Sequence, residues 1–142
     1  MYQKDYILRM IEMIGDLIAG ILGMIKKGDY TKASQSLEDA YYDYLKQDAS
    51  FFQSIPKEEL TVKLLREHNY THGHLEILSE LFYAQAELFN AQGLPRESLD
   101  FYEKSHLLFD FVIKESKSFS IQKQDKLTAL QHRIDQLKGH LS

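Results

Sequence analysis

The sequence predicts an all-α fold, and three observations support that prediction. Apolar residues recur every three or four positions along nearly the whole chain, which is the spacing that places them on one face of a helix. No stretch shows a sustained alternation of apolar and polar residues, so no sheet is expected. Glycine and proline are few, with 7 and 2 among 142 residues. Because 142 residues is a common length for one domain, we expect a single-domain antiparallel bundle of about six helices over residues 1–142.

The N-terminal half predicts two helices joined by a glycine turn. The first covers about 3–27, and Gly28 is a typical C-terminal stop. A second helix is expected over about 30–47, with Leu37 on its inner face. The apolar face of the first helix is formed by Ile7, Ile11, Ile14, Ile18, Ile21 and Ile25.

The middle of the chain predicts a loop followed by a shorter helix. Residues 48–56 have the weakest periodicity and are expected to be a loop. Pro56 suits the first turn of a helix over about 57–69, because proline already has a helical φ and needs no amide donor there.

The C-terminal half predicts three further helices. The first of them covers about 74–92 and ends at Gly93. Pro95 begins the next, which covers about 95–116. The last covers about 120–139, where leucine and isoleucine repeat at three-four spacing and are expected to pack against the bundle.

Composition excludes several function classes. With 21 acidic and 17 basic residues the net charge is −4, and the longest basic run is Lys26-Lys27, so nucleic acid is not an expected partner. There is no cysteine, which removes disulfides and thiolate chemistry and fits a reducing, cytoplasmic location. No phosphate-binding glycine loop or nucleophile motif is present, so we expect no cofactor and favour a non-enzymatic role over an enzymatic one.

One segment has the apolar character of a membrane anchor. Residues 7–25 are largely apolar, but Arg9, Glu12 and Asp16 interrupt the run. Charged side chains are costly in lipid, so we interpret this segment as a buried helix and expect no membrane partner.

Two places in the chain have the same pattern. Each begins at a glycine, Gly28 or Gly93, and is followed by a small residue at the fifth position, a bulky one at the ninth and a small one at the twelfth. These residues are Ala33, Leu37 and Ala40 in one case and Ser98, Tyr102 and Ser105 in the other.

This pattern resembles the tetratricopeptide repeat, in which two antiparallel helices cross tightly at small residues. The two glycines are 65 residues apart (93 − 28), near twice the repeat's period of about 34 residues. The resemblance implies helical hairpins that bind a protein or peptide partner. A plain bundle with two similar turns is the alternative.

The N-terminal helix carries a second resemblance. The run Lys4-Asp5-Tyr6-Ile7-Leu8-Arg9-Met10-Ile11-Glu12 is similar to the start of a family of small uncharacterised helical proteins from Gram-positive bacteria. The resemblance implies a bacterial cytoplasmic protein and no particular activity.

Four residues on the helix expected at 74–92 are candidates for an interaction face. If the second hairpin is a repeat unit, Glu80, Tyr83, Glu87 and Asn90 face its inner groove. An aromatic side chain flanked by acids suits a basic or mixed peptide segment. An ordinary exposed helix face is the alternative.

A stripe of small residues in the first helix is a second candidate. Gly15, Ala19 and Gly23 repeat every four positions, which lets another backbone approach closely. The stripe predicts either packing within the fold, against the helix at 120–139, or the seam of a homodimer.

Histidines provide two further candidates. His68, His72 and His74 form a cluster that would suit zinc or another first-row metal, although their spacing matches no familiar zinc motif. The alternative is a polar loop whose histidines cap helix ends. His106 lies on an apolar face, where it is either a core residue or a polar handle in a ligand cavity.

These observations order the functional hypotheses. A non-catalytic protein–protein interaction or adaptor module, able to self-associate, comes first. A small-ligand sensor with an interhelical pocket comes second, and a metal-dependent enzyme using the region of His68, His72 and His74 comes third.

Overall fold

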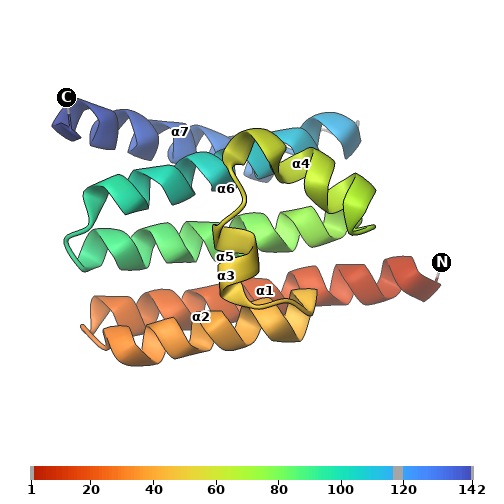
Figure 1. Cartoon of the computed structure of the whole chain (residues 1–142), viewed down its shortest axis with the longest axis horizontal. Coiled ribbons are helices and arrows are strands. Elements are labelled where there is room, and N and C mark those ends of the chain that lie inside the picture. The colour runs from red at the N-terminus through yellow and green to blue at the C-terminus, as the bar shows by residue number, and fades with distance from the viewer. Residues whose placement is uncertain (1, 117–119, 142) are drawn as a thin grey trace.

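The chain is a bundle of α-helices, as the sequence predicts. The computed structural model describes residues 2–116 and 120–141, and this part of the chain contains helices and turns but no strand. Figure 1 shows the long helices lying side by side, with a short crossing segment in front of them. Every helix in the described part is too short or too polar to cross a membrane.

Within the described residues, five long helices form the bundle. In the order of Figure 1, α2 and α1 lie at one side, followed by α5, α6 and α7. Helices α1, α5 and α7 run in the same direction, and α2 and α6 run in the opposite one. The bounds of these helices are Tyr2–Lys26 (α1), Tyr30–Leu45 (α2), His72–Ala91 (α5), Pro95–Ser116 (α6) and Ile121–Leu141 (α7).

Helix α5 is the centre of the bundle, because α1, α2 and α6 all pack against it. Its apolar residues are buried over most of its length, including Leu75, Leu78, Leu81 and Phe82, each at most 1% exposed. Helix α7 packs mainly on α6. This arrangement leaves one side of α5 open between α1 and α7.

The two glycine turns have the same backbone geometry. Gly28 and Gly93 have φ values of 82° and 78°, which favour glycine because a Cβ is strained there. The amide after each glycine donates to the carbonyl five residues earlier, from Asp29 to Met24 and from Leu94 to Phe89, at 2.9 Å in both. Both are therefore Schellman ends that reverse the chain into the next helix.

The small and bulky residues that follow these glycines are buried in both hairpins. Ala33, Leu37 and Ala40 of α2 are at most 2% exposed, and Ser98, Tyr102 and Ser105 of α6 are 0% exposed. In the α5–α6 pair the serines also join the helices, because Ser98 donates to the carbonyl of Ala86 at 2.8 Å and Ser105 donates to that of Ser79 at 2.7 Å. The shared pattern therefore marks the tight crossing of each pair of helices.

The segment between α2 and α5 differs from the prediction. Helix α2 ends at Leu45, before the expected residue 47, because Lys46 adopts a left-handed conformation with φ 62°. The expected loop at 48–56 contains a short helix, α3, from Ala49 to Gln53. Its Phe52 is fully buried and stacks on Tyr41 with ring centres 5.8 Å apart, so core packing orders a segment with weak periodicity.

The expected helix at 57–69 is wrong as one continuous element. The chain makes a 3₁₀ turn (η1, Lys57–Glu59), one α turn (α4, Leu60–Val62) and a π turn (η2, Lys63–Glu67). Leu60 and Leu64 are fully buried. Beyond the π turn, the hydroxyl of Tyr70 donates to the carbonyl of Leu45 at 2.6 Å and ties the segment to the end of α2.

Helix α5 begins earlier than the expected residue 74. Thr71 caps it by accepting the amide proton of His74 at 3.3 Å, while the Thr71 amide donates to Nδ1 of His74 at 3.0 Å. This reciprocal pair is a capping box, which fixes the start of the helix at His72. Gly73 therefore lies in the first turn and does not separate two helices.

Candidate functional site

The candidate site begins with the polar contacts between α5 and α7. Three glutamates spaced along α5 each pair with a cation on α7. Glu76 pairs with Lys123 at 3.6 Å, Glu80 pairs with Lys126, and Glu87 pairs with Arg133 at 3.0 Å. A fourth cation, Lys138, pairs with Glu103 of α6 at 3.5 Å. Helix α7 is therefore aligned on the bundle by a row of ion pairs.

Glu87 is the centre of the most extensive of these contacts. One of its oxygens accepts hydrogen bonds from the Tyr102 hydroxyl and from the guanidinium of Arg133. The other accepts from the Tyr83 hydroxyl at 3.3 Å. The Nε of Arg133 also donates to the Tyr102 oxygen at 3.2 Å. Four side chains from α5, α6 and α7 thus form one connected network.

The network keeps its tyrosines neutral. Burial, together with the charge of Glu87 and the hydrogen bond to it, raises the pKa of Tyr83 to about 12. Burial and the same carboxylate also raise the pKa of Tyr102 well above its usual range. Both hydroxyls are protonated at neutral pH and donate to Glu87, whose carboxylate they help to position.

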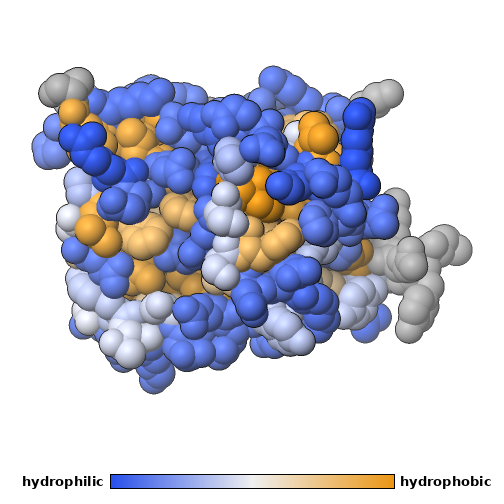
Figure 2. Space-filling view, in the orientation of Figure 1, coloured by the Kyte–Doolittle hydropathy of each residue, from blue (hydrophilic) through white to orange (hydrophobic). Residues whose placement is uncertain are grey.

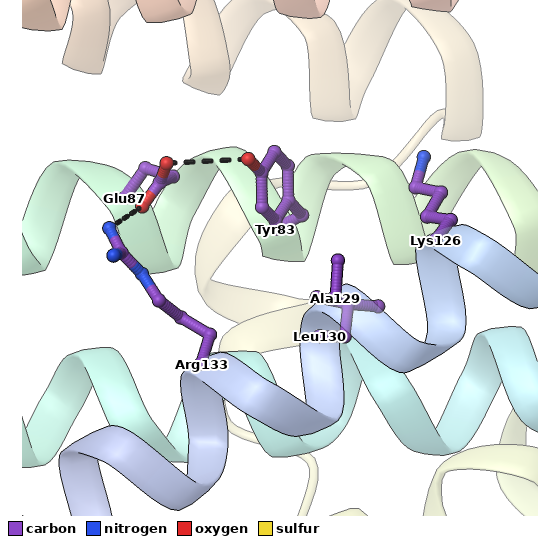
Figure 3. Close-up of a pocket in the computed structure, with 6 residues that line it drawn as sticks. All are labelled: Tyr83, Glu87, Lys126, Ala129, Leu130 and Arg133. Atoms are coloured by element: carbon purple, nitrogen blue, oxygen red, sulfur yellow. Dashed lines mark hydrogen bonds and ion pairs between the residues drawn. The ribbon is translucent and has the colours of Figure 1, made fainter.

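A groove runs along α5 beside this network. A first cavity of about 410 Å³ lies between α5 and α7, and Figure 3 shows its lining side chains pointing toward one another from the two helices. A second of about 330 Å³ adjoins it, sharing Glu87 and Arg133. A third of about 440 Å³ shares Asn90 and Arg133 with the second. We call this continuous surface the α5 groove.

The α5 groove is lined by apolar or aromatic side chains and by polar or charged ones in equal number. Its walls are formed by α1, α5 and α7, the three helices that run in the same direction. The lining residues are Leu22, Ile25 and Lys26 of α1, Tyr83, Glu87, Asn90 and Ala91 of α5, and Lys126, Ala129, Leu130, Arg133, Gln136, Leu137 and His140 of α7.

The sequence predicts an acidic surface around Tyr83, but the groove has mixed charge. Glu80 and Glu87 do flank Tyr83 along α5, but both carboxylates are paired with cations of α7. The surface therefore presents mixed charge, and it offers no uncompensated acidic face to a strongly basic segment.

Three of the four residues predicted for the interaction face meet here, and the fourth adjoins them. Tyr83 and Glu87 line the first cavity, Glu80 pairs with Lys126 at its edge, and Asn90 lines the second and third cavities. The contribution of α7 was not predicted, although Lys126 and Arg133 lie seven residues apart, matching the spacing of Glu80 and Glu87.

The stripe of Gly15, Ala19 and Gly23 does not pack against α7. Gly15 and Ala19 are exposed, and a Cβ added at Gly15 or Gly23 would meet no described atom within 4 Å. The expectation that the stripe packs against the helix at 120–139 is therefore wrong, because α1 turns its isoleucines toward α5 and leaves Gly15 and Ala19 exposed and Gly23 half-buried. A homodimer seam at the stripe stays a prediction.

The three clustered histidines make separate contacts. His68 meets Phe51 edge-on at 4.9 Å, His72 stacks on Phe111 at 5.7 Å, and His74 caps α5. Among the described residues, no group of three or more histidines and carboxylates is placed to hold a metal ion. The contact of His74 is the capping interaction of the alternative interpretation, whereas those of His68 and His72 are ring contacts.

His106 is half-buried on α6, and burial lowers its pKa. It does not line the α5 groove, so it provides no polar handle in that surface.

Comparison of the chain with protein-family models, with curated proteins and with solved structures finds no match. The fold and the site define a helical bundle with an open groove along α5.

Proposed function

We propose that this chain is a non-catalytic interaction module that binds a segment of a partner protein in the α5 groove. The observation that carries the proposal is the continuity of the groove along α5. Arg133 lines all three cavities, Glu87 lines the first and second, and Asn90 lines the second and third. An elongated surface of this kind suits a chain segment better than a single small molecule.

The lining residues indicate what the partner segment contains. Leu22, Ala129 and Leu137 offer apolar contacts in different parts of the groove. Because the acids are paired with α7, we expect apolar anchors in the partner with charges of both signs between them. The Asn90 amide, exposed at the junction of two cavities, can both donate to and accept from a peptide backbone.

The network under the groove supports a binding role. Tyr83 and Arg133 are held by Glu87, so two large side chains of the surface are already ordered before a partner arrives. Ordering in advance lowers the entropy that binding would otherwise lose. The resemblance of the two hairpins to tetratricopeptide repeats supports the same role. The lack of cysteine supports a cytoplasmic setting, and the resemblance of the run at 4–12 to small helical proteins from Gram-positive bacteria supports a bacterial one.

A random peptide library displayed against the full chain tests this proposal. Ala129→Arg places a long charged side chain in the first cavity, at a position that is exposed and so is expected to leave the fold intact. Gln122→Arg is the matched control, because it adds the same charge to an exposed position of α7 that does not line the groove.

Selected peptides should bind the wild type and Gln122→Arg equally, and bind Ala129→Arg at least about tenfold more weakly, which corresponds to about 1.4 kcal/mol. Selection of no peptide above background, or equal binding to Ala129→Arg, would contradict the proposal.

A further inference from the structure

A second surface lies on the other side of α1, between α1 and α2. A cavity of about 430 Å³ is lined there by Tyr6, Arg9, Met10, Met13, Asp43 and Tyr44. We call it the α1–α2 patch. It shares no lining residue with the α5 groove.

The patch exposes large apolar side chains that the fold does not cover. Tyr6 is 59% exposed and Met13 is 56% exposed, and their separation of seven positions, two helical turns, places both on one side of α1. Single exposed apolar residues are normal on a protein surface, but a cluster around a hollow is typical of an interface.

The charges of the patch are self-complementary. Arg9 on α1 and Asp43 on α2 are both exposed and line the same cavity. Neither makes an ion pair with a side chain that the structure describes. The patch therefore presents one cation and one anion on two different helices, with apolar groups around them.

We propose that the α1–α2 patch is the homodimer interface of this protein, and that its partner is a second copy of the chain. In a two-fold dimer the same patch meets itself, so each residue on one copy faces a different residue of the patch on the other. An axis through the middle of the patch places Arg9 of each copy opposite Asp43 of the other. The apolar residues, Tyr6 and Met13 among them, are then removed from water on both copies.

This inference concerns a different face from the peptide groove and does not depend on it. It also assigns self-association to a different part of α1 from the stripe of Gly15, Ala19 and Gly23. Glycine and alanine in that stripe offer little apolar area to bury. Arg9 and Asp43, the charged pair of the patch, do not belong to the stripe.

Charge exchange between two copies tests the proposal. Arg9→Glu leaves only acidic side chains at the two charged positions, and Asp43→Arg leaves only basic ones. Both positions are exposed, so helicity and thermal midpoint should match those of the wild type. The native mass of the untagged full chain is measured by analytical ultracentrifugation over a range of concentrations.

The wild type should be a dimer. The dissociation constant of the dimer should be at least about tenfold higher for each single variant than for the wild type, because like charges then face one another across the interface. An equimolar mixture of the two variants should restore dimers, because each copy supplies the sign that the other lacks. This restoration is not expected if the substitutions act by damaging the fold.

Three outcomes would overturn the proposal: a monomeric wild type, single variants that dimerise as the wild type does, or a mixture that fails to restore dimers. Ala19→Glu is the control for the small-residue stripe, and it should leave the dimer intact. If it alone dissociates the dimer, the interface lies at the stripe and the proposal is wrong.

Ala129→Arg separates this proposal from the proposed function. It should keep the dimer while losing the selected peptides, and Arg9→Glu should keep the peptides while losing the dimer. A chain that binds peptides but stays monomeric contradicts only the dimer.

Discussion

The α5–α6 seam and the α7 seam are built on different physical principles. Between α5 and α6, Ala86, Ser98 and Ser105 are fully buried and let the helices approach closely. Among the described residues of α7 only Leu130 and Ile134 are buried, each 3% exposed, while four cations pair with glutamates of α5 and α6. The first seam depends on shape and the second largely on charge.

The difference indicates where the bundle is least stable. Close packing of apolar groups responds little to salt, whereas exposed ion pairs are screened and contribute little each. We therefore expect α7 to open locally before the hairpins do, as segments with few buried contacts commonly do. Because α7 forms one wall of the α5 groove, such opening would reshape the proposed binding surface.

The largest expected effect contrasts a leucine in each region. Leu78→Ala removes a side chain that is 1% exposed in α5 and should lower the free energy of unfolding by about 2–5 kcal/mol. Leu130→Ala removes the same atoms from α7 and should instead accelerate hydrogen exchange of the α7 amides, with exchange in α5 and α6 little changed. Denaturant unfolding measures the loss of global stability, and native-state hydrogen exchange measures the local opening of α7. An equal global loss in both variants would show that α7 unfolds together with the hairpins.

A smaller effect is expected from the charge network. Glu87→Gln weakens the bonds to Arg133 and Tyr102 while keeping the shape of the side chain. It should destabilise the docking of α7 by about 1 kcal/mol, which raises amide exchange in α7 about fivefold. Added salt should act in the same direction. Glu38→Gln on the exposed face of α2 is the control, and an equal effect there would contradict a specific role for Glu87.

The smallest effect concerns pH at the start of α5. Burial lowers the pKa of His74 below 6.5, and its Nδ1 accepts the amide proton of Thr71 only while the ring is neutral there. The folded pKa is below the unfolded one, so the stabilisation is present above about pH 6.5 and is lost as pH falls through the folded value. An NMR titration should show the protection factor of the Thr71 amide, its exchange rate relative to an unstructured chain at the same pH, falling as pH drops through the folded pKa of His74. In His74→Asn this pH dependence should be absent, and its persistence would assign it to another group.

The sequence predicts the hairpins well because their signals are local. Gly28 and Gly93 end helices through a backbone conformation that glycine favours, and the buried positions after each follow from helical spacing. Phe52 shows where local signals end, because its burial against Tyr41 comes from distant contacts and produces a helix where a loop is expected.

The candidate site was predicted in part. Glu80, Tyr83, Glu87 and Asn90 share one face of α5, which helical spacing alone indicates. Arg133 is 46 residues from Glu87 along the chain, and no local pattern shows which acid of the bundle it meets.

By itself the sequence determined the all-α class, the two glycine turns and the faces of the long helices, because each depends on residues within a few positions of one another. Only the tertiary structure decided that α7 pairs with the acids of α5, that the stripe on α1 stays open, and that Arg9 and Asp43 share one hollow. Those outcomes depend on how whole helices dock, where many weak contacts between distant residues add together and no single local preference decides.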